Sequence, residues 1–279
     1  MNTQAIPATA ASAQRHPFPA PSTSLRSTRW WAGHFKANAT RDRSIPWTNN
    51  PPLSPAEFAR IAPSIAEFQR GESSEARNYL AKSAAFADAA GEPSFHEASR
   101  LFVREENHHA ELLLRFMKGA GMPAQTAAFS DGVFRRIRSA SDIGWSCRVL
   151  VIAEFVAQEY YPCLRDLSSH PVLKRVCEKL IHDEFAHIRF QVERIARVEA
   201  PRGLLVRSVR ELLQTVLTAG ACVVVWRNHR AVLAPLGFTG FLSRVLRRNH
   251  RAIVAIRRAR QQTSDTAPAG NRLRAALPH

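Results

Sequence analysis

Cysteine is scarce in this chain, and the few cysteines are not spaced for a metal site. The 279 residues include only four, with no Cys-x-x-Cys pair: Cys147, Cys163, Cys177 and Cys222. This spacing predicts no structural zinc and favours a reducing compartment, so we expect a cytoplasmic protein. No uninterrupted apolar run reaches the roughly 18 residues of an ordinary membrane-spanning helix. The first thirty or so residues also lack the apolar block of a secretory signal, and we expect no such leader.

Acidic residues are nearly missing from both ends of the chain. Residues 1–60 have 7 basic and 2 acidic side chains, residues 61–200 have 18 and 19, and residues 201–279 have 14 and 2. All 14 basic residues of the last segment are arginines. The net charge of +16 therefore lies outside the nearly neutral middle. We expect the ends to contact an anionic surface or an acidic partner, and we predict no specific nucleic-acid partner.

Sustained alternation of polar and apolar residues is absent as well, which predicts an all-α chain. We expect residues 1–52 to form a disordered or extended N-terminal arm, with its tryptophans packed onto the rest of the protein. Residues 53–200 are predicted to form a four-helix bundle, residues 201–260 a C-terminal helical extension, and residues 261–279 a disordered tail.

Capping residues, glycines and prolines place the four helices of the predicted bundle. Ser54–Glu57 and Ser94–Glu97 both read as capping boxes, and the first has proline at the first helical position. Helices are expected over about 63–90, 94–118, 142–167 and 171–200, with a kink at Pro162 and a short helical turn after Ser130.

The lengths of the connections predict how these helices are arranged. The first and second helices, and the third and fourth, are joined by only a few residues, so each pair should form an antiparallel hairpin. About two dozen residues join the second helix to the third. A connection of this length allows the third helix to run parallel to the second, as in a ferritin-like bundle with one long crossover.

Two Glu-x-x-His sequences are the chemical signature of the predicted bundle. Glu106 and His109 lie on the second helix, and Glu184 and His187 lie on the fourth. Residues three apart share one face of a helix, so each carboxylate and imidazole could bind the same metal ion. Two such pairs alone leave a pair of metal ions short of ligands, and the first and third helices should each add a glutamate.

The midpoints of the two hairpins select these additional glutamates. Residues facing each other across an antiparallel hairpin lie equally far from its turn, which favours Glu75 opposite Glu106 and Glu154 opposite Glu184. Glu72 and Glu159 fit this rule less well and stay open as alternatives. Glu154 also lies within an apolar stretch, where a carboxylate is costly unless it is paired or bound to metal.

Four carboxylates and two neutral imidazoles carry a formal charge of about −4, which balances two divalent cations and suits iron or manganese. The spacing in the second helix is ambiguous, because Glu105 and His108 are also three apart. We prefer Glu106 and His109, since an acid then precedes both ligand glutamates. These acids, Glu105 and Asp183, could accept hydrogen bonds from the ligand histidines. Tyr161 lies seven residues after Glu154 and is a candidate for a position behind the ligands.

These residues resemble the ferritin-like di-iron carboxylate superfamily over roughly residues 60–200. The resemblance rests on Glu75, Glu154, and the Glu106/His109 and Glu184/His187 pairs, together with the long crossover. It implies two iron ions, or a Mn/Fe or Mn/Mn pair, bridged by carboxylates. It further implies an oxidoreductase that uses O₂ and an electron donor to oxidise or hydroxylate a small organic substrate.

Two other functions remain open at this stage. The same bundle could serve as a ferroxidase, iron-handling protein or peroxidase. The chain could alternatively be a non-enzymatic binding protein that uses its basic C-terminal segment. We expect the N-terminal arm and C-terminal helices to prevent assembly of a 24-subunit cage. The basic segment Arg244–Arg260 is a candidate for contact with an anionic membrane surface or acidic partner, which would make the protein peripheral to a membrane.

Overall fold

The computed structural model describes residues 25–40, 45–49, 51–72, 76–124 and 141–266, and only the backbone for the last five of these. The described residues are helices joined by short turns and loops, without a strand, so the predicted all-α class is confirmed. The predicted turn after Ser130 lies outside these residues, as do most of the N-terminal arm and most of the C-terminal tail.

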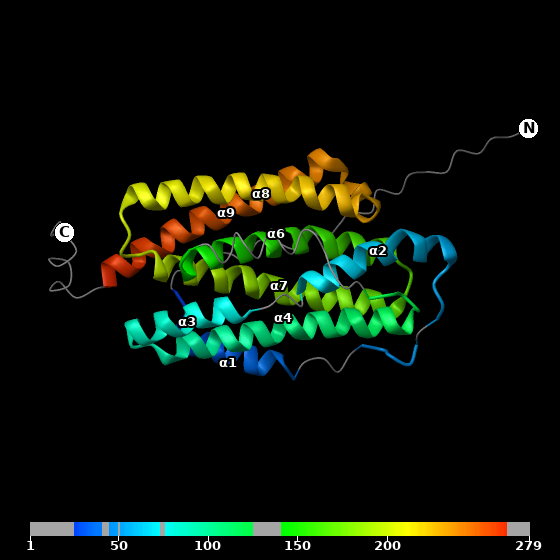
Figure 1. Cartoon of the computed structure of the whole chain (residues 1–279), viewed down its shortest axis with the longest axis horizontal. Coiled ribbons are helices and arrows are strands. Elements are labelled where there is room, and N and C mark those ends of the chain that lie inside the picture. Colours follow the sequence, from blue (N-terminus) through cyan, green and yellow to red (C-terminus); the bar gives the residue numbers. More distant parts are fainter. Residues whose placement is uncertain (1–24, 41–44, 50, 73–75, 125–140, 267–279) are drawn as a thin grey trace, which may run out of the picture.

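The central bundle consists of α2 (Pro55–Glu72), α3 (Arg77–Ala90), α4 (Pro93–Gly119), α6 (Ile143–Leu167) and α7 (Pro171–Val198). Local sequence sets several of their ends. The Asp142 side chain accepts a hydrogen bond from the Trp145 amide and caps α6, while Gly91 ends α3 with a φ of 65°, a conformation that glycine adopts without strain. In Figure 1 α6 and α7 run antiparallel, whereas α6 runs parallel to α4.

The first predicted helix differs from the structure in two ways. It begins earlier, at Pro55, where the Glu57 amide donates to the Ser54 hydroxyl. It is also described as two helices, α2 and α3, rather than as one continuous helix over 63–90. In α4 the helix starts at Pro93, so Ser94 lies inside it and its hydroxyl contacts Thr28 instead of capping the helix.

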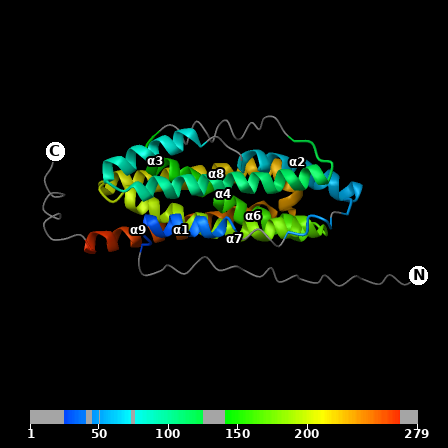
Figure 2. The same ribbon diagram turned by 90° about the horizontal axis from the view of Figure 1, so that it is seen from below.

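The N-terminal arm contains a helix, α1 (Thr28–Asn38), where an extended or disordered segment was expected. Two of its aromatic side chains pack onto the protein, as predicted: Trp31 and Phe35 are buried against Phe190 of α7, whereas Trp30 is exposed. The Trp31 indole also donates to Glu193, at 2.8 Å. Burial of this apolar face explains why a segment with weak local helix signals forms a helix. Figure 2 shows α1 lying against the bundle.

Two long helices follow the bundle, α8 (Leu204–Leu233) and α9 (Gly237–Thr266), separated by the 3₁₀ turn Ala234–Leu236. They lie along the side of the bundle opposite α1 (Figure 1), where α8 contacts α6 and α9 contacts α7. Within Leu204–Gln261, one 18-residue window has a mean hydropathy of 1.4, enough by length and composition to cross a membrane, and 28% of it is buried. Composition alone does not distinguish such a helix from one that packs through a single face.

Buried ion pairs hold the two C-terminal helices to the bundle. Arg148 of α6 is fully buried and donates to both oxygens of Glu199, at 2.8 and 2.7 Å, and to Gln214 of α8 at 2.5 Å. Arg260 of α9 donates to the same Glu199 at 2.6 Å. Several arginines of the basic segment therefore have partners inside the protein. This segment is less available for an external anion than its sequence implies.

Candidate metal centre

The two Glu-x-x-His pairs meet in the interior of the bundle. Glu106 and His109 of α4 face Glu184 and His187 of α7, and one ligand atom from each lies within 4.8 Å of the other three. His109, Glu184 and His187 are fully buried, and Glu106 is partly buried. This group could hold a metal ion.

Each histidine is oriented by a carboxylate from the opposite helix. Asp183 lies 3.0 Å from Nε2 of His109, and Glu105 lies 3.0 Å from Nε2 of His187. A carboxylate at Nε2 favours the proton on that nitrogen and leaves the lone pair on Nδ1. The Nδ1 atoms face the glutamates of the group, at 2.9 Å between His187 and Glu106 and 3.5 Å between His109 and Glu184.

The structure places Glu105 and Asp183 behind the histidines, where the sequence predicted hydrogen-bond partners of ligands. It also brings Glu106 and His109, rather than Glu105 and His108, into the group with Glu184 and His187. His108 is instead partly exposed and contacts Glu111 on its own helix.

Asn38, at the end of α1, joins the two outer carboxylates and was not identified from the sequence. Its amide donates to Glu105 and, at 2.8 Å, to Asp183. Lys179, one turn before Asp183, donates to the same carboxylate at 2.7 Å. Asn38 is distant in sequence and carries no motif. Only the packing of α1 onto α4 and α7 reveals it.

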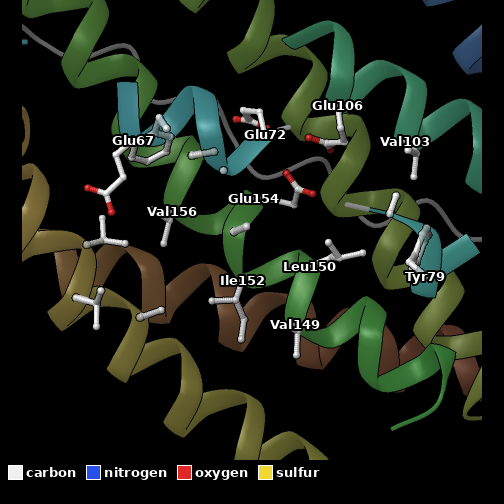
Figure 3. Close-up of a pocket in the computed structure, with 18 of the residues that line it drawn as sticks. Glu67, Glu72, Tyr79, Val103, Glu106, Val149, Leu150, Ile152, Glu154 and Val156 are labelled. Carbon is white, nitrogen blue, oxygen red and sulfur yellow. The ribbon is translucent and has the colours of Figure 1, made fainter. Parts of the chain in front are cut away.

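Two further carboxylates complete the acidic side of the group (Figure 3). Glu154 of α6 lies 3.9 Å from Nδ1 of His187, and its side chain points toward those of Glu72 and Glu106. Glu159, the alternative to Glu154, lies elsewhere and forms an ion pair with Arg248 at 2.7 Å. Glu72, the alternative to Glu75, is the last residue of α2, whereas Glu75, the preferred candidate, lies outside the described residues and stays a prediction.

Tyr161 contacts this group through Glu72. Its buried hydroxyl donates a hydrogen bond to the Glu72 carboxylate, and its ring lies 5.4 Å from the ring of Tyr160. Tyr161 is thus one hydrogen bond behind a carboxylate of the group, a position that the sequence predicted in outline. The sequence did not predict Glu72 as its hydrogen-bond partner, because Tyr161 was selected for its spacing of seven residues from Glu154.

Burial and neighbouring carboxylates together shift the pKa values of the glutamates and histidines of the group. Burial, followed by the nearby carboxylates of Glu106 and Glu184, raises the pKa of Glu72 and Glu154 well above its ordinary value. Burial lowers the pKa of both histidines, but their carboxylate neighbours outweigh it and raise the pKa of His109 and His187. This group of side chains thus favours the binding of positive charge, whether protons or a metal cation.

Three buried atoms of the group lack a well-aligned hydrogen bond: Nδ1 of His109, Oε1 of Glu184, and Oε1 of Glu106, which lies 2.9 Å from Nδ1 of His187. Buried polar atoms normally have partners, and each orphan costs about 1–3 kcal/mol. All three are atoms that would bind a cation in the centre of the group. The residues present therefore fit a metal ion bound by carboxylates and imidazoles.

Neither a protein-family model, nor a curated protein, nor a solved structure matches this chain. Its function must therefore be inferred from the helical fold and the geometry of the buried group.

Proposed function

We propose that the chain is an O₂-dependent oxidoreductase with a dinuclear metal centre, most simply di-iron, inside a ferritin-like bundle. The observation that carries this proposal is the set of orphaned atoms on Glu106, His109 and Glu184, facing one another in a buried group. Helices α4 and α6 run parallel, which the long connection between them allows, and this direction supports a ferritin-like bundle.

The donor set matches two hard or borderline divalent cations. Glu106, His109, Glu184 and His187 would supply the shared core of ligands, with Glu72 and Glu154 as the flanking carboxylates; Glu75 stays a candidate. Four carboxylates and two neutral imidazoles give a formal charge of about −4, which two divalent ions would neutralise. Bound iron would supply the electrons that activate O₂ for attack on an organic substrate, with an external electron donor restoring them.

The protein's own groups have three roles in this scheme. Glu105 and Asp183 hold the histidine rings with Nδ1 directed inward, which prepares them to bind without reorganisation. The hydroxyl of Tyr161 donates a hydrogen bond to Glu72, so its proton can be transferred to that carboxylate. The apolar side chains beside the group lower the polarity around its carboxylates, which strengthens their attraction for cations.

Anaerobic loading with Fe(II), followed by a pulse of O₂, tests the proposal. We expect about two iron ions per chain and rapid oxidation of both ions. Absorption and Mössbauer spectroscopy measure this oxidation. The Glu184→Gln variant should lose iron binding, because it removes one of the buried ligands. Glu178→Gln is the matched control, since Glu178 is exposed on the same helix and pairs with Arg175.

A wild-type chain that stays free of metal under these conditions would refute the proposal. Continued uptake of iron far beyond two ions per chain, as oxidised mineral, would favour an iron-handling protein on the same bundle.

A further inference from the structure

A cavity of about 210 Å³ adjoins the carboxylates of the metal group. Glu72, Glu106 and Glu154 lie along its wall, and most of the remaining surface comes from apolar side chains such as Val103, Leu150 and Ile152 (Figure 3). Helices α2, α4, α6 and α8 all contribute to this wall. An apolar molecule in the cavity would thus contact the metal group directly.

The charged groups that line the cavity are of one sign. Besides the three carboxylates, Glu67 lines the opposite end, and no lysine or arginine is among the described lining residues. His229 also lies there, and burial lowers its pKa to about 4, so the imidazole is neutral near pH 7. In the metal-free chain, a carboxylate or phosphate on a ligand would therefore find no lysine or arginine on this wall and would face carboxyl groups.

The volume of the cavity indicates how much of a ligand it can enclose. An apolar cavity of about 150 Å³ accommodates benzene. A cavity of 210 Å³ accordingly has room for a ring with a short side chain, or for a hydrocarbon chain of similar size.

We propose that this cavity is a binding site for a neutral apolar molecule, with about six to ten carbon atoms enclosed, and that in the metal-free chain it rejects organic anions. The site is defined by the cavity and its walls alone. That the bound molecule is the substrate of the metal centre rests on the proposed function.

A pair of probes with similar shape and different charge tests the site. Binding of 4-fluorotoluene and of 4-fluorobenzoate to the full chain can be followed by fluorine NMR, both before and after removal of metal with a chelator. In the metal-free chain we expect fluorotoluene to bind at least about tenfold more tightly than fluorobenzoate, because only the neutral probe avoids burying an unpaired charge.

A pair of alanine variants locates the bound probe. Ala153 lines the cavity in the middle of α6, and its side chain is accessible there, so Ala153→Leu should fill part of the volume and weaken fluorotoluene binding about tenfold. Ala85→Leu, on the exposed face of α3 away from the cavity, is the control and should leave binding unchanged.

Equal binding of the two probes, or equal binding by wild type and Ala153→Leu, would overturn the cavity proposal. Its failure is separable from that of the metal proposal, because probe binding does not require iron and iron content does not require the probe.

A second inference concerns the outer face of α8. Apart from Trp30, all strongly exposed large apolar side chains of the described residues lie on this helix, between Leu204 and Val224. Leu205, Leu212 and Val216 are 78%, 65% and 59% exposed. We refer to the exposed apolar residues of 204–224 as the α8 stripe. It extends about 30 Å along the helix.

The α8 stripe ends in arginine. Residues eighteen apart occupy the same face of an α-helix, so the exposed Arg227 and Arg230 continue the lines of Val209 and Leu212. The single acidic residue of α8, Glu211, is buried and pairs with Arg257 at 2.5 Å. The exposed charge of the helix is therefore all positive.

We propose that the α8 stripe lies in the surface layer of an anionic lipid membrane, with Arg227 and Arg230 at the lipid phosphates. An exposed apolar face flanked only by cations is the pattern of helices that lie in a membrane interface. A second copy of the chain is a poorer occupant. In an antiparallel pair, Arg227 and Arg230 of each helix would lie near the start of the other, where the single acid of α8, Glu211, is buried and paired with Arg257.

Sedimentation with lipid vesicles tests the membrane proposal. The full chain should bind vesicles of phosphatidylcholine mixed equally with phosphatidylserine at least about tenfold more strongly than phosphatidylcholine alone. The double variant Leu212→Gln/Val216→Gln should lose binding to both. Arg227→Gln/Arg230→Gln should lose only the preference for phosphatidylserine.

Arg247→Gln/Arg251→Gln is the matched control, because these arginines are exposed on α9. It should retain most of the binding. Failure of wild type to bind either vesicle would overturn the proposal, as would an equal loss in the α9 control. So would a dimer in solution that Leu212→Gln/Val216→Gln converts to a monomer, because a second copy would then cover the stripe.

Discussion

Replacement of Asp183 by asparagine is the most direct test of how the metal group is organised. The Asp183 carboxylate is 1% exposed and accepts three hydrogen bonds: from His109 at 3.0 Å, from Lys179 at 2.7 Å and from Asn38 at 2.8 Å. The first two donors approach one oxygen and Asn38 approaches the other. An amide at this position retains the shape but removes the charge and one acceptor.

No orientation of the new amide satisfies all three donors. If the new amide nitrogen points toward His109 and Lys179, it places a donor against two donors. If it points toward Asn38, it places a donor against an amide that also donates to Glu105. Each buried donor left without an acceptor costs about 1–3 kcal/mol. We therefore expect Asp183→Asn to destabilise the metal-free chain by about that amount.

The same change should weaken metal binding by about 10–100-fold, because the ring of His109 loses the carboxylate that holds Nδ1 inward. Competition with a chelator measures the affinity, and urea unfolding measures the stability. Glu178→Gln removes the same charge from the exposed face of α7 and should change neither. An Asp183→Asn chain with wild-type metal affinity, or a comparable loss in Glu178→Gln, would show that the carboxylate does not act by orienting His109.

Three further perturbations probe separate parts of the molecule. Tyr161→Phe removes the hydroxyl that donates to Glu72, and we expect iron content to stay at wild type while the rate of iron oxidation after an O₂ pulse falls severalfold; an unchanged rate in stopped-flow absorption would exclude a role for this proton. Arg148→Met leaves Glu199 buried with fewer partners and should cost about 3–5 kcal/mol in urea unfolding, against less than about 1 kcal/mol for the partly exposed Arg165→Met. Burial lowers the pKa of His229 to about 4, so the unfolded chain binds one more proton than the folded chain between about pH 6.5 and 4. The free energy of unfolding therefore falls on acidification from pH 7, by up to about 3 kcal/mol from this residue. His229→Gln should remove this component from the pH dependence of unfolding, and an identical slope in wild type and variant would contradict it.

Local sequence relations predicted the part of the site that depends on a single helix. Residues three apart necessarily share a helical face, so the pairs Glu106/His109 and Glu184/His187 could be identified before any fold was known. Hairpin symmetry added Glu154, because two antiparallel helices joined by a short turn must bring equidistant residues together. The all-α class followed from the absence of strand periodicity, and glycines and prolines gave the approximate bounds of the helices expected over 142–167 and 171–200.

Tertiary structure decided what depends on the rotation and contacts of separate helices. Whether Glu105 or Glu106 joins the group of possible ligands depends on one step of about 100° around α4, which the spacing alone leaves open. The crossed contacts of Glu105 with His187 and of Asp183 with His109 require α4 and α7 to be packed together.

The same holds for residues distant from the motifs. Asn38 reaches both outer carboxylates only because burial of Trp31 and Phe35 makes the N-terminal arm helical. The arginines of α9, which looked available for an external anion, include several that form ion pairs inside the protein, whereas the exposed apolar face belongs to α8. Sequence determines which chemical groups a helix carries and which of them share a face. Which face becomes buried is decided by the packing of the whole chain, because burial is a property of neighbours that the sequence does not place side by side.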